Sequence, residues 1–163
     1  MAKTSELEAA YKATTYRVFL PSGICELRLG EPCESLRCWL ESADCTAFAL
    51  ITAHNPGSMP TDEATNAERQ SQLECELLEG NYEPYAAQHI SDADLWPDEE
   101  SCFVPDISTE DACALAADYG QNALVRGGPA ATAVLCFIFS WTEFLLSLQL
   151  TTSTTSTIST SPG

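Results

Sequence analysis

Basic residues are scarce in this sequence. Its 163 residues include 7 Lys and Arg against 24 Asp and Glu, which gives a formal net charge of -17. A field of that sign repels phosphate backbones, so the composition argues against direct binding to nucleic acid. The same acidic excess leaves open a decoy that imitates a phosphate polymer, although solvated acidic surfaces are far commoner than such mimics.

The sequence also lacks the patterns of secretion, of zinc binding and of common cofactor sites. No apolar core of the length that a secretory signal needs follows Met1, so we expect a cytoplasmic protein with reduced thiols. The eight cysteines form no Cys-x-x-Cys pair and have no histidine at ligand spacing, so we expect no metal site. Phosphate-binding loops and dinucleotide-binding glycine patterns are missing too, and we expect no cofactor.

The sequence has enough apolar residues to form one hydrophobic core, because 45% of its residues are hydrophobic. Two short runs rich in β-branched and aromatic residues, 16–20 and 24–29, flank Pro21-Ser22-Gly23 and predict a β-hairpin. After Glu31-Pro32, apolar residues recur at helical spacing. They predict a first helix, in which proline suits the first turn because its missing N–H costs nothing there.

The middle of the chain predicts a buried strand, a helix and a long loop. Residues 47–51 are continuously apolar and end at a polar turn, as a central strand would. Thr61 is the expected N-cap of the next helix, and Gly80 is its expected end. Residues 81–101 contain two prolines and an acidic run with little periodicity, which predicts an irregular connection. The acidic run is interpreted as solvated, with a divalent-cation site as the less favoured alternative.

The last part of the domain predicts strand, helix and strand. Cys102-Phe103-Val104 has strand composition, and Ser108 with Asp111 three positions later resembles a capping box for a helix that Gly120 ends. Residues 121–125 then predict a short strand. The sequence as a whole predicts an α+β fold in which a small mixed sheet packs with about three helices in a single domain.

The C-terminal part differs in character from the rest. We expect a compact domain over residues 11–128, an atypical apolar segment over 129–150 and a disordered Ser/Thr-rich tail over 151–163. The apolar segment is long enough to span a membrane, but Glu143 and Gln149 lie within it and no basic cluster flanks it, so a membrane span is disfavoured. A packed or loosely attached tail is favoured. An edge strand over 134–139 followed by a short helix, or a terminus altered by drift or by a change of reading frame, are the alternatives.

Three separated motifs resemble one bacterial family. They are Ile51-Thr52-Ala53-His54-Asn55-Pro56, Asn66-Ala67-Glu68-Arg69 and Gly120-Gln121-Asn122-Ala123. The family is catalogued as domain of unknown function 3293, and its members share an Ile-Thr-Ala-x-Asn-Pro turn, an Asn-x-x-Arg helix start and a Gly-Gln-Asn-Ala terminus. The resemblance spans roughly residues 11–126, and the sequence departs from the family pattern after Arg126. The family has no assigned activity or cofactor, so the resemblance gives no expectation about either.

Polar residues in and near these motifs are candidates for a ligand site. At about 100° per residue, Asn66 and Arg69 share the core-facing side of the predicted helix with two leucines. Buried amides need partners, either within the protein or from a ligand. The predicted cleft contains Thr52, Asn55, Asn66, Arg69, Gln121 and Asn122. A hydrogen-bond network that stabilises the turn is the plainer interpretation of the same residues, and the favoured one.

These observations favour a binding or regulatory module whose cleft takes a small polar ligand or a protein segment. An enzyme that acts at the same cleft, with His54 or Glu100 as acid or base, is the first alternative. Neither histidine stands in a spacing that identifies a nucleophile system. The acidic decoy is the second alternative.

Overall fold

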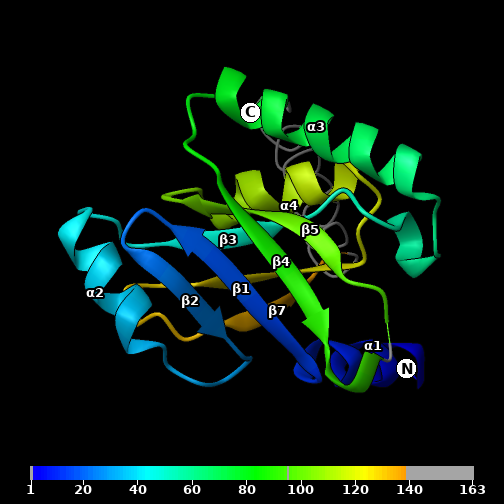
Figure 1. The fold of residues 1–163 in the computed structure, drawn as a ribbon, viewed down its shortest axis with the longest axis horizontal. Helices are drawn as coiled ribbons and strands as arrows, with labels where there is room; N and C mark the ends of the chain where they lie inside the picture. Colours follow the sequence, from blue (N-terminus) through cyan, green and yellow to red (C-terminus); the bar gives the residue numbers. More distant parts are fainter. Residues whose placement is uncertain (1, 95, 139–163) are drawn as a thin grey trace, which may run out of the picture.

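The structure is a computed structural model that describes residues 2–94 and 96–138. Figure 1 shows a curved sheet with helices on both of its faces and at its ends. In chain order the elements are α1 (Ala2–Lys12), β1 (Thr14–Leu20), β2 (Gly23–Leu27), α2 (Glu34–Ser42), β3 (Phe48–Ile51), the 3-10 helix η1 (Pro56–Ser58), α3 (Glu63–Glu79), β4 (Tyr85–Ser91), the 3-10 helix η2 (Asp92–Asp94), β5 (Glu99–Pro105), α4 (Thr109–Asp118), β6 (Ala123–Gly127) and β7 (Val134–Phe137).

A single seven-stranded sheet connects these elements, in the order β2-β1-β4-β5-β3-β6-β7. The predicted α+β class is confirmed, but the prediction of a mixed sheet is wrong, because every neighbouring pair of strands is antiparallel. The described residues also contain four α-helices rather than about three. Helix α1 escaped prediction because its few apolar residues form no clear helical stripe.

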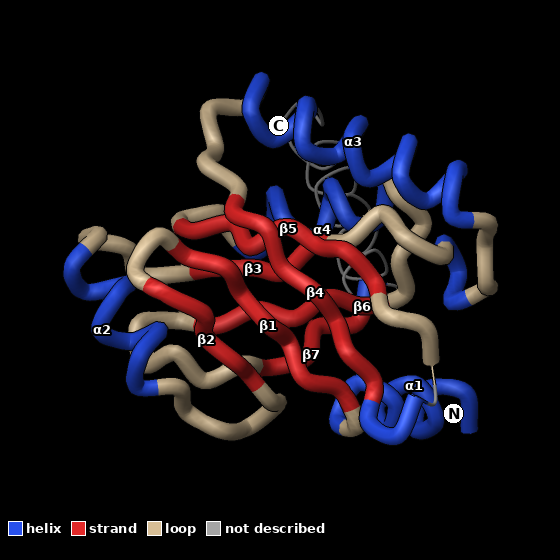
Figure 2. The backbone as a smooth tube through the Cα atoms, in the orientation of Figure 1, coloured by secondary structure: helices blue, strands red, loops and turns tan. Residues whose placement is uncertain are grey.

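The two ends of the sheet approach each other through the segments next to β2 and β7. The Gly30 amide donates to the Ala133 carbonyl at 2.9 Å, and the Cys33 amide donates to the Ala131 carbonyl at 3.1 Å. Pro32 and Thr132 form an isolated bridge between the same segments. The sheet therefore curls around one of its faces, which we call the inner face (Figure 2).

Each face of the sheet carries its own hydrophobic core. On the inner face Tyr16, Phe48 and Phe103 pack with Leu36 and Leu40 of α2. On the outer face α3 and α4 cover the sheet, and their residues pack against alternate positions of β3, β5 and β6. Strand β3 lies between β5 and β6 and is buried on both faces, which is why its sequence is continuously apolar.

Most of the predicted elements are confirmed, with one corrected helix start. The hairpin is β1–β2, the first helix is α2 and the buried strand is β3. Helix α3 ends at Gly80 as expected, but its N-cap is Asp62, whose carboxylate accepts the Thr65 amide at 3.0 Å. Thr61 was the predicted cap. Its amide instead donates to the Asn55 side chain at 2.8 Å, so Thr61 belongs to the preceding turn.

The prediction of an irregular connection over 81–101 is wrong. This segment contains β4 and the first residues of β5, and β4 is paired on both sides, with β1 and with β5. Its composition is poor in β-branched residues, because Ile90 is the only one in the strand and Ala86 and Ala87 lie near its start. Pairing with two neighbouring strands overrides that weak local preference.

The described part of the C-terminal region continues the sheet. Strand β7 pairs with β6 at the sheet edge, within the range of the edge-strand alternative, and Ala131 and Ala133 are buried. The boundaries predicted at residues 128 and 150 stay predictions. Residues 139–163, including the tail predicted to be disordered and most of the apolar segment, lie outside the described residues. Within the described ranges, no helix has the length and apolar content needed to cross a membrane.

Candidate functional site

The turn that follows β3 brings several of the predicted site residues together. The Asn55 amide donates to the Asn66 side-chain oxygen at 2.9 Å, and the Asn66 side-chain nitrogen donates back to Asn55 Oδ1 at 3.0 Å. The same nitrogen donates to the Thr61 carbonyl at 3.1 Å. Both asparagines are buried. This reciprocal pair fixes the turn onto the first turns of α3.

The backbone of this turn is left-handed at Asn55, Gly57 and Ser58. Asn55 has φ of 48° and Gly57 has φ of 67°, as expected for asparagine and glycine in a tight turn. The Gly57 amide donates to the Gly120 carbonyl at 2.7 Å. The Asn122 side chain donates to the Ser58 hydroxyl at 2.9 Å. The turn is therefore fixed to the C-terminal end of α4 as well.

The remaining predicted residues donate to carbonyls of the protein itself. Arg69 donates to the Ala53 carbonyl at 3.1 Å and to the Tyr119 carbonyl at 2.6 Å. Gln121 donates to the His54 carbonyl at 3.0 Å, and Thr52 donates to the Glu100 carbonyl at 2.6 Å. Much of the polar capacity of the predicted cleft is thus used inside the protein, and a ligand-binding role for the six residues stays a prediction.

A cavity of about 220 Å³ lies beside this turn. Residues of α1, β1 and β4 line it, together with the segment that leads into β5. Of the six predicted site residues, only Asn55 and Gln121 contribute to the lining. The other side chains that line it are Leu7, Ala10, Tyr11, Ala13, Thr14, Tyr16, Ser58, His89, Ser91, Trp96 and Glu99.

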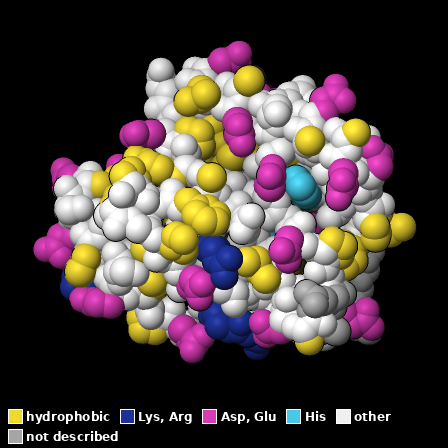
Figure 3. Space-filling model, viewed as in Figure 1, with side chains coloured by type: hydrophobic (Ala, Val, Ile, Leu, Met, Phe, Trp, Pro, Cys, Tyr) yellow, Lys and Arg dark blue, Asp and Glu magenta, His cyan; other side chains and the backbone are white. Residues whose placement is uncertain are grey.

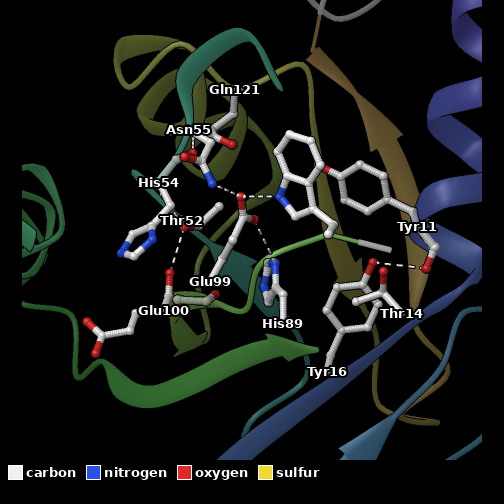
Figure 4. Close-up of polar contacts among 12 residues, drawn as sticks. Tyr11, Thr14, Tyr16, Thr52, His54, Asn55, His89, Glu99, Glu100 and Gln121 are labelled. Atoms are coloured by element: carbon white, nitrogen blue, oxygen red, sulfur yellow. Dashed lines mark hydrogen bonds and ion pairs between the residues drawn. The ribbon is translucent and has the colours of Figure 1, made fainter. Parts of the chain in front are cut away.

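The register of three neighbouring strands creates the polar floor of this cavity. Tyr16 of β1 pairs with His89 of β4, and His89 pairs with Glu99 of β5. Directly opposed residues in an antiparallel ladder project to the same face, so the three side chains form a row. Figure 4 shows Glu99 between Asn55 and His89, with Tyr11 and Tyr16 on the far side of His89.

Glu99 is held by neutral donors on one of its two oxygens. Its Oε2 accepts the Asn55 side-chain nitrogen at 2.6 Å and the Trp96 indole nitrogen at 3.0 Å. Its Oε1 lies 3.9 Å from His89 Nδ1, which is beyond hydrogen-bonding distance. The Glu99 side chain is 14% exposed. A nearly buried carboxyl group therefore points one unbonded oxygen into its surroundings.

Burial keeps the aromatic groups around Glu99 neutral at pH 7. Together with a smaller effect of the neighbouring His54, it lowers the pKa of His89 to about 3. Burial also raises the pKa of Tyr11 and of Tyr16 above the ordinary tyrosine range. The imidazole therefore does not form an ion pair with Glu99, and neither phenol adds a charge.

Helix α1 closes one side of the cavity and is tied to the sheet by several contacts. The Tyr16 hydroxyl donates to the Tyr11 carbonyl at 3.1 Å, and the Tyr11 hydroxyl donates to the Ala123 carbonyl at 3.3 Å. Arg28 donates to the Lys12 carbonyl at 2.9 Å while its guanidinium also binds both oxygens of Asp92. The cavity wall is thus fixed in place without a ligand.

Sequence reasoning missed the central residues of the cavity. His89 and Glu99 fall in the segment that was predicted to be a loop, so no common face was expected for them. In the folded strand Ala87 and His89 are buried alternately, but the sequence Tyr85–Ser91 shows no clear alternation of apolar and polar residues that would have predicted β4. The two predicted acid–base candidates lie elsewhere, since Glu100 is exposed and neither it nor His54 lines the cavity.

The fold and the site define an α+β protein with a curled antiparallel sheet and an aromatic-lined cavity at one end of its inner face. A family model described as "Protein of unknown function (DUF3293)" matches residues 51–124. The predicted resemblance to this family is confirmed over that range, which contains Asn55, His89 and Glu99. No curated protein and no solved structure matches the chain.

Proposed function

We propose that this protein is a binding module for a small ligand, and that the ligand occupies the cavity between α1 and the strands β1, β4 and β5. The observation that carries the proposal is the cavity itself, with Glu99 held in a fixed position at its floor. Pre-formed cavities with apolar and aromatic walls and a few oriented polar groups are the usual form of small-molecule sites.

The predicted cleft residues take two different roles in this proposal. Asn55 and Gln121 line the cavity and are placed to contact a ligand. Thr52, Asn66, Arg69 and Asn122 hold the surrounding turn, because their donors are used by the protein. An enzyme that uses His54 or Glu100 has less support, since neither residue lines the cavity.

The size of the cavity limits the ligand. Sites for drug-sized molecules have volumes of about 300–1,000 Å³, and this cavity of about 220 Å³ is smaller. A single small metabolite fits such a volume better than a dinucleotide or a peptide segment. The protein-segment alternative therefore has less support at this site.

Thermal unfolding of the full-length protein with a library of amino acids, nucleotides and other metabolites tests the proposal. A ligand that binds only the folded state stabilises it by about 2.7 kcal/mol at one hundred times its Kd. For a chain of this length that corresponds to a rise in Tm of roughly 5–10 °C. The Ala10→Trp variant should abolish the rise, because Ala10 is an exposed residue of α1 that lines the cavity and the indole would fill it.

Ala9→Trp is the matched control. Ala9 is also an exposed residue of the same helix but does not line the cavity, so this variant should keep the ligand-induced rise. If no compound raises the Tm of the wild type by more than it raises that of Ala10→Trp, the cavity is not a ligand site. If both tryptophan variants lose the rise equally, the effect belongs to α1 and the proposal is wrong.

A further inference from the structure

We infer that the ligand of this cavity is a small organic cation, such as an amine or an amidine, whose N–H groups donate to Glu99. The inference rests on the proposed binding function and adds the chemical class of the ligand. It follows from three properties of the cavity: which hydrogen-bond donors are already used, which acceptors are unused, and what charge the surroundings carry.

Most donors in the cavity wall are already bonded within the protein, and among the described residues the Ser58 hydroxyl and the one N–H of neutral His89 are the exceptions. The hydroxyl groups of Tyr11 and Tyr16 donate to main-chain carbonyls. The indole N–H of Trp96 donates to Glu99, and the Gln121 side-chain nitrogen donates to two carbonyls, at 3.0 and 3.4 Å. A ligand that relies on accepting hydrogen bonds, such as a carboxylate or a phosphate, would have to break some of these contacts.

Acceptors, by contrast, are left without partners. Among the described residues, no donor reaches Glu99 Oε1, and both hydrogen bonds to this carboxyl group go to Oε2. His89 is 8% exposed, and its Nε2 is buried with no hydrogen-bond partner among the residues that the structure describes. A neutral imidazole carries one acceptor nitrogen and one N–H donor, and neither is hydrogen-bonded here. A ligand rich in N–H groups gives Glu99 Oε1 the hydrogen-bond donor that the described residues do not supply.

The charge of Glu99 is also uncompensated within the described ranges. Its one basic neighbour at ion-pair distance is His89, which is neutral at pH 7, and no Lys or Arg of these ranges lies that close. A cation donating to Oε1 would supply both the missing charge and the missing hydrogen bond, and charge-assisted bonds of this kind are the stronger ones.

The wider surroundings favour a cation as well. The net charge of -17 attracts positive ligands and repels anions, and on the face drawn in Figure 3 acidic side chains are spread widely, with fewer basic ones. The rings of Tyr11, Tyr16 and Trp96 line the cavity. Their negative faces stabilise cations through cation–π contacts, which gain strength where water is excluded.

Three probes of nearly identical shape and different charge test the inference. Benzylamine is a cation at pH 7, benzyl alcohol is neutral and benzoate is an anion. Binding of each to the full-length protein is measured by chemical-shift titration in NMR. We expect benzylamine to bind at least tenfold more tightly than benzyl alcohol, and benzoate to bind more weakly than either. Raising the salt concentration should weaken only the binding of benzylamine.

Two charge-removing variants locate the effect. Glu99→Gln keeps an oxygen that accepts from Asn55 and Trp96, so the cavity should keep its shape while the carboxylate is lost. It should weaken benzylamine binding about tenfold or more and change benzyl alcohol binding by less than threefold. Glu100→Gln is the control, because it removes the same formal charge from the adjacent, exposed residue of β5, and it should leave all three affinities within threefold of wild type.

The outcomes separate this inference from the proposed function. If benzyl alcohol or benzoate binds as tightly as benzylamine, and Ala10→Trp abolishes that binding, the cavity is a ligand site but the cationic class is wrong. If benzylamine binding survives Glu99→Gln, or is lost equally in Glu100→Gln, the assignment to Glu99 is wrong. If benzylamine does not bind to the wild type, the inference fails. The proposed function then depends on the metabolite library alone.

Discussion

Replacement of Asn66 by alanine is the sharpest test of the network that supports the site. The Asn66 side chain accepts one hydrogen bond, from the Asn55 amide, and donates two, to Asn55 Oδ1 and to the Thr61 carbonyl. In Asn66→Ala all three are lost. The Asn55 amide is then left buried without a partner, because Asn55 is only 5% exposed.

The size of the effect follows from these contacts. An unsatisfied buried amide costs about 1–3 kcal/mol, and the other two lost bonds add about 1 kcal/mol each where water does not replace them. Alanine has a better helix propensity than asparagine, which returns about 0.5–0.7 kcal/mol. We therefore expect a net loss of about 2–4 kcal/mol in the free energy of unfolding, or a fall in Tm of roughly 5–15 °C.

Urea and thermal unfolding of the full-length protein measure this loss. Glu68→Ala is the control, because Glu68 is an exposed residue of the same helix with no hydrogen bond of its side chain within the described ranges. It should change the free energy of unfolding by less than about 0.5 kcal/mol. If Asn66→Ala is as stable as Glu68→Ala, the reciprocal pair with Asn55 does not carry the turn, and the argument for a structural network is refuted.

Three further predictions concern the backbone, the arginine and the buried histidine. Gly120→Ala should lower stability by about 1–2 kcal/mol, because Gly120 has φ of 71° and an added Cβ would lie 3.0 Å from Pro56 Cβ, whereas Gly80→Ala should be nearly neutral by the same unfolding assay. Arg69→Lys should cost about 1–2 kcal/mol in urea unfolding, because an ammonium does not reproduce the fork that reaches two carbonyls, and an unchanged midpoint would contradict this. The pKa of His89 is lowered to about 3 in the folded protein, against about 6.5 in the unfolded chain. Between these two pH values only the unfolded chain binds the proton. The free energy of unfolding therefore falls on acidification by about 1.4 kcal/mol per pH unit. Wild type should therefore lose about 2 kcal/mol more than His89→Phe between pH 6.5 and pH 5, and equal losses would show that His89 is not buried in its neutral form.

Local patterns predicted the elements whose sequence agrees with their environment. Strand β3 is apolar because both of its faces are buried, and α4 begins where Ser108 caps it through the Asp111 amide at 3.1 Å. The periodicity of α3 also predicted which of its sides faces the core, since Asn66 on that side is buried while Cys75 on the opposite side is exposed. These features depend on a few neighbouring residues, so sequence alone was sufficient.

Strand β4 and helix α1 were not predictable in this way. Strand β4 contains Ala86 and Ala87 near its start and has weak strand propensity, and it becomes a strand because β1 and β5 satisfy its backbone on both sides. Helix α1 has no apolar stripe of its own and is held by contacts such as the bond from Arg28 to the Lys12 carbonyl. Both elements depend on partners that are distant in the sequence.

The sequence by itself determined the acidic charge, the α+β class, the resemblance to the family and the turn that Asn55, Pro56 and Gly57 form. Each of these depends on composition or on residues within a few positions of one another. Only the tertiary structure decided where the cavity lies and that Glu99 is its central group, because the pairing of β1, β4 and β5 sets which side chains share a face. A shift of one residue in that register would turn His89 and Glu99 away from the cavity.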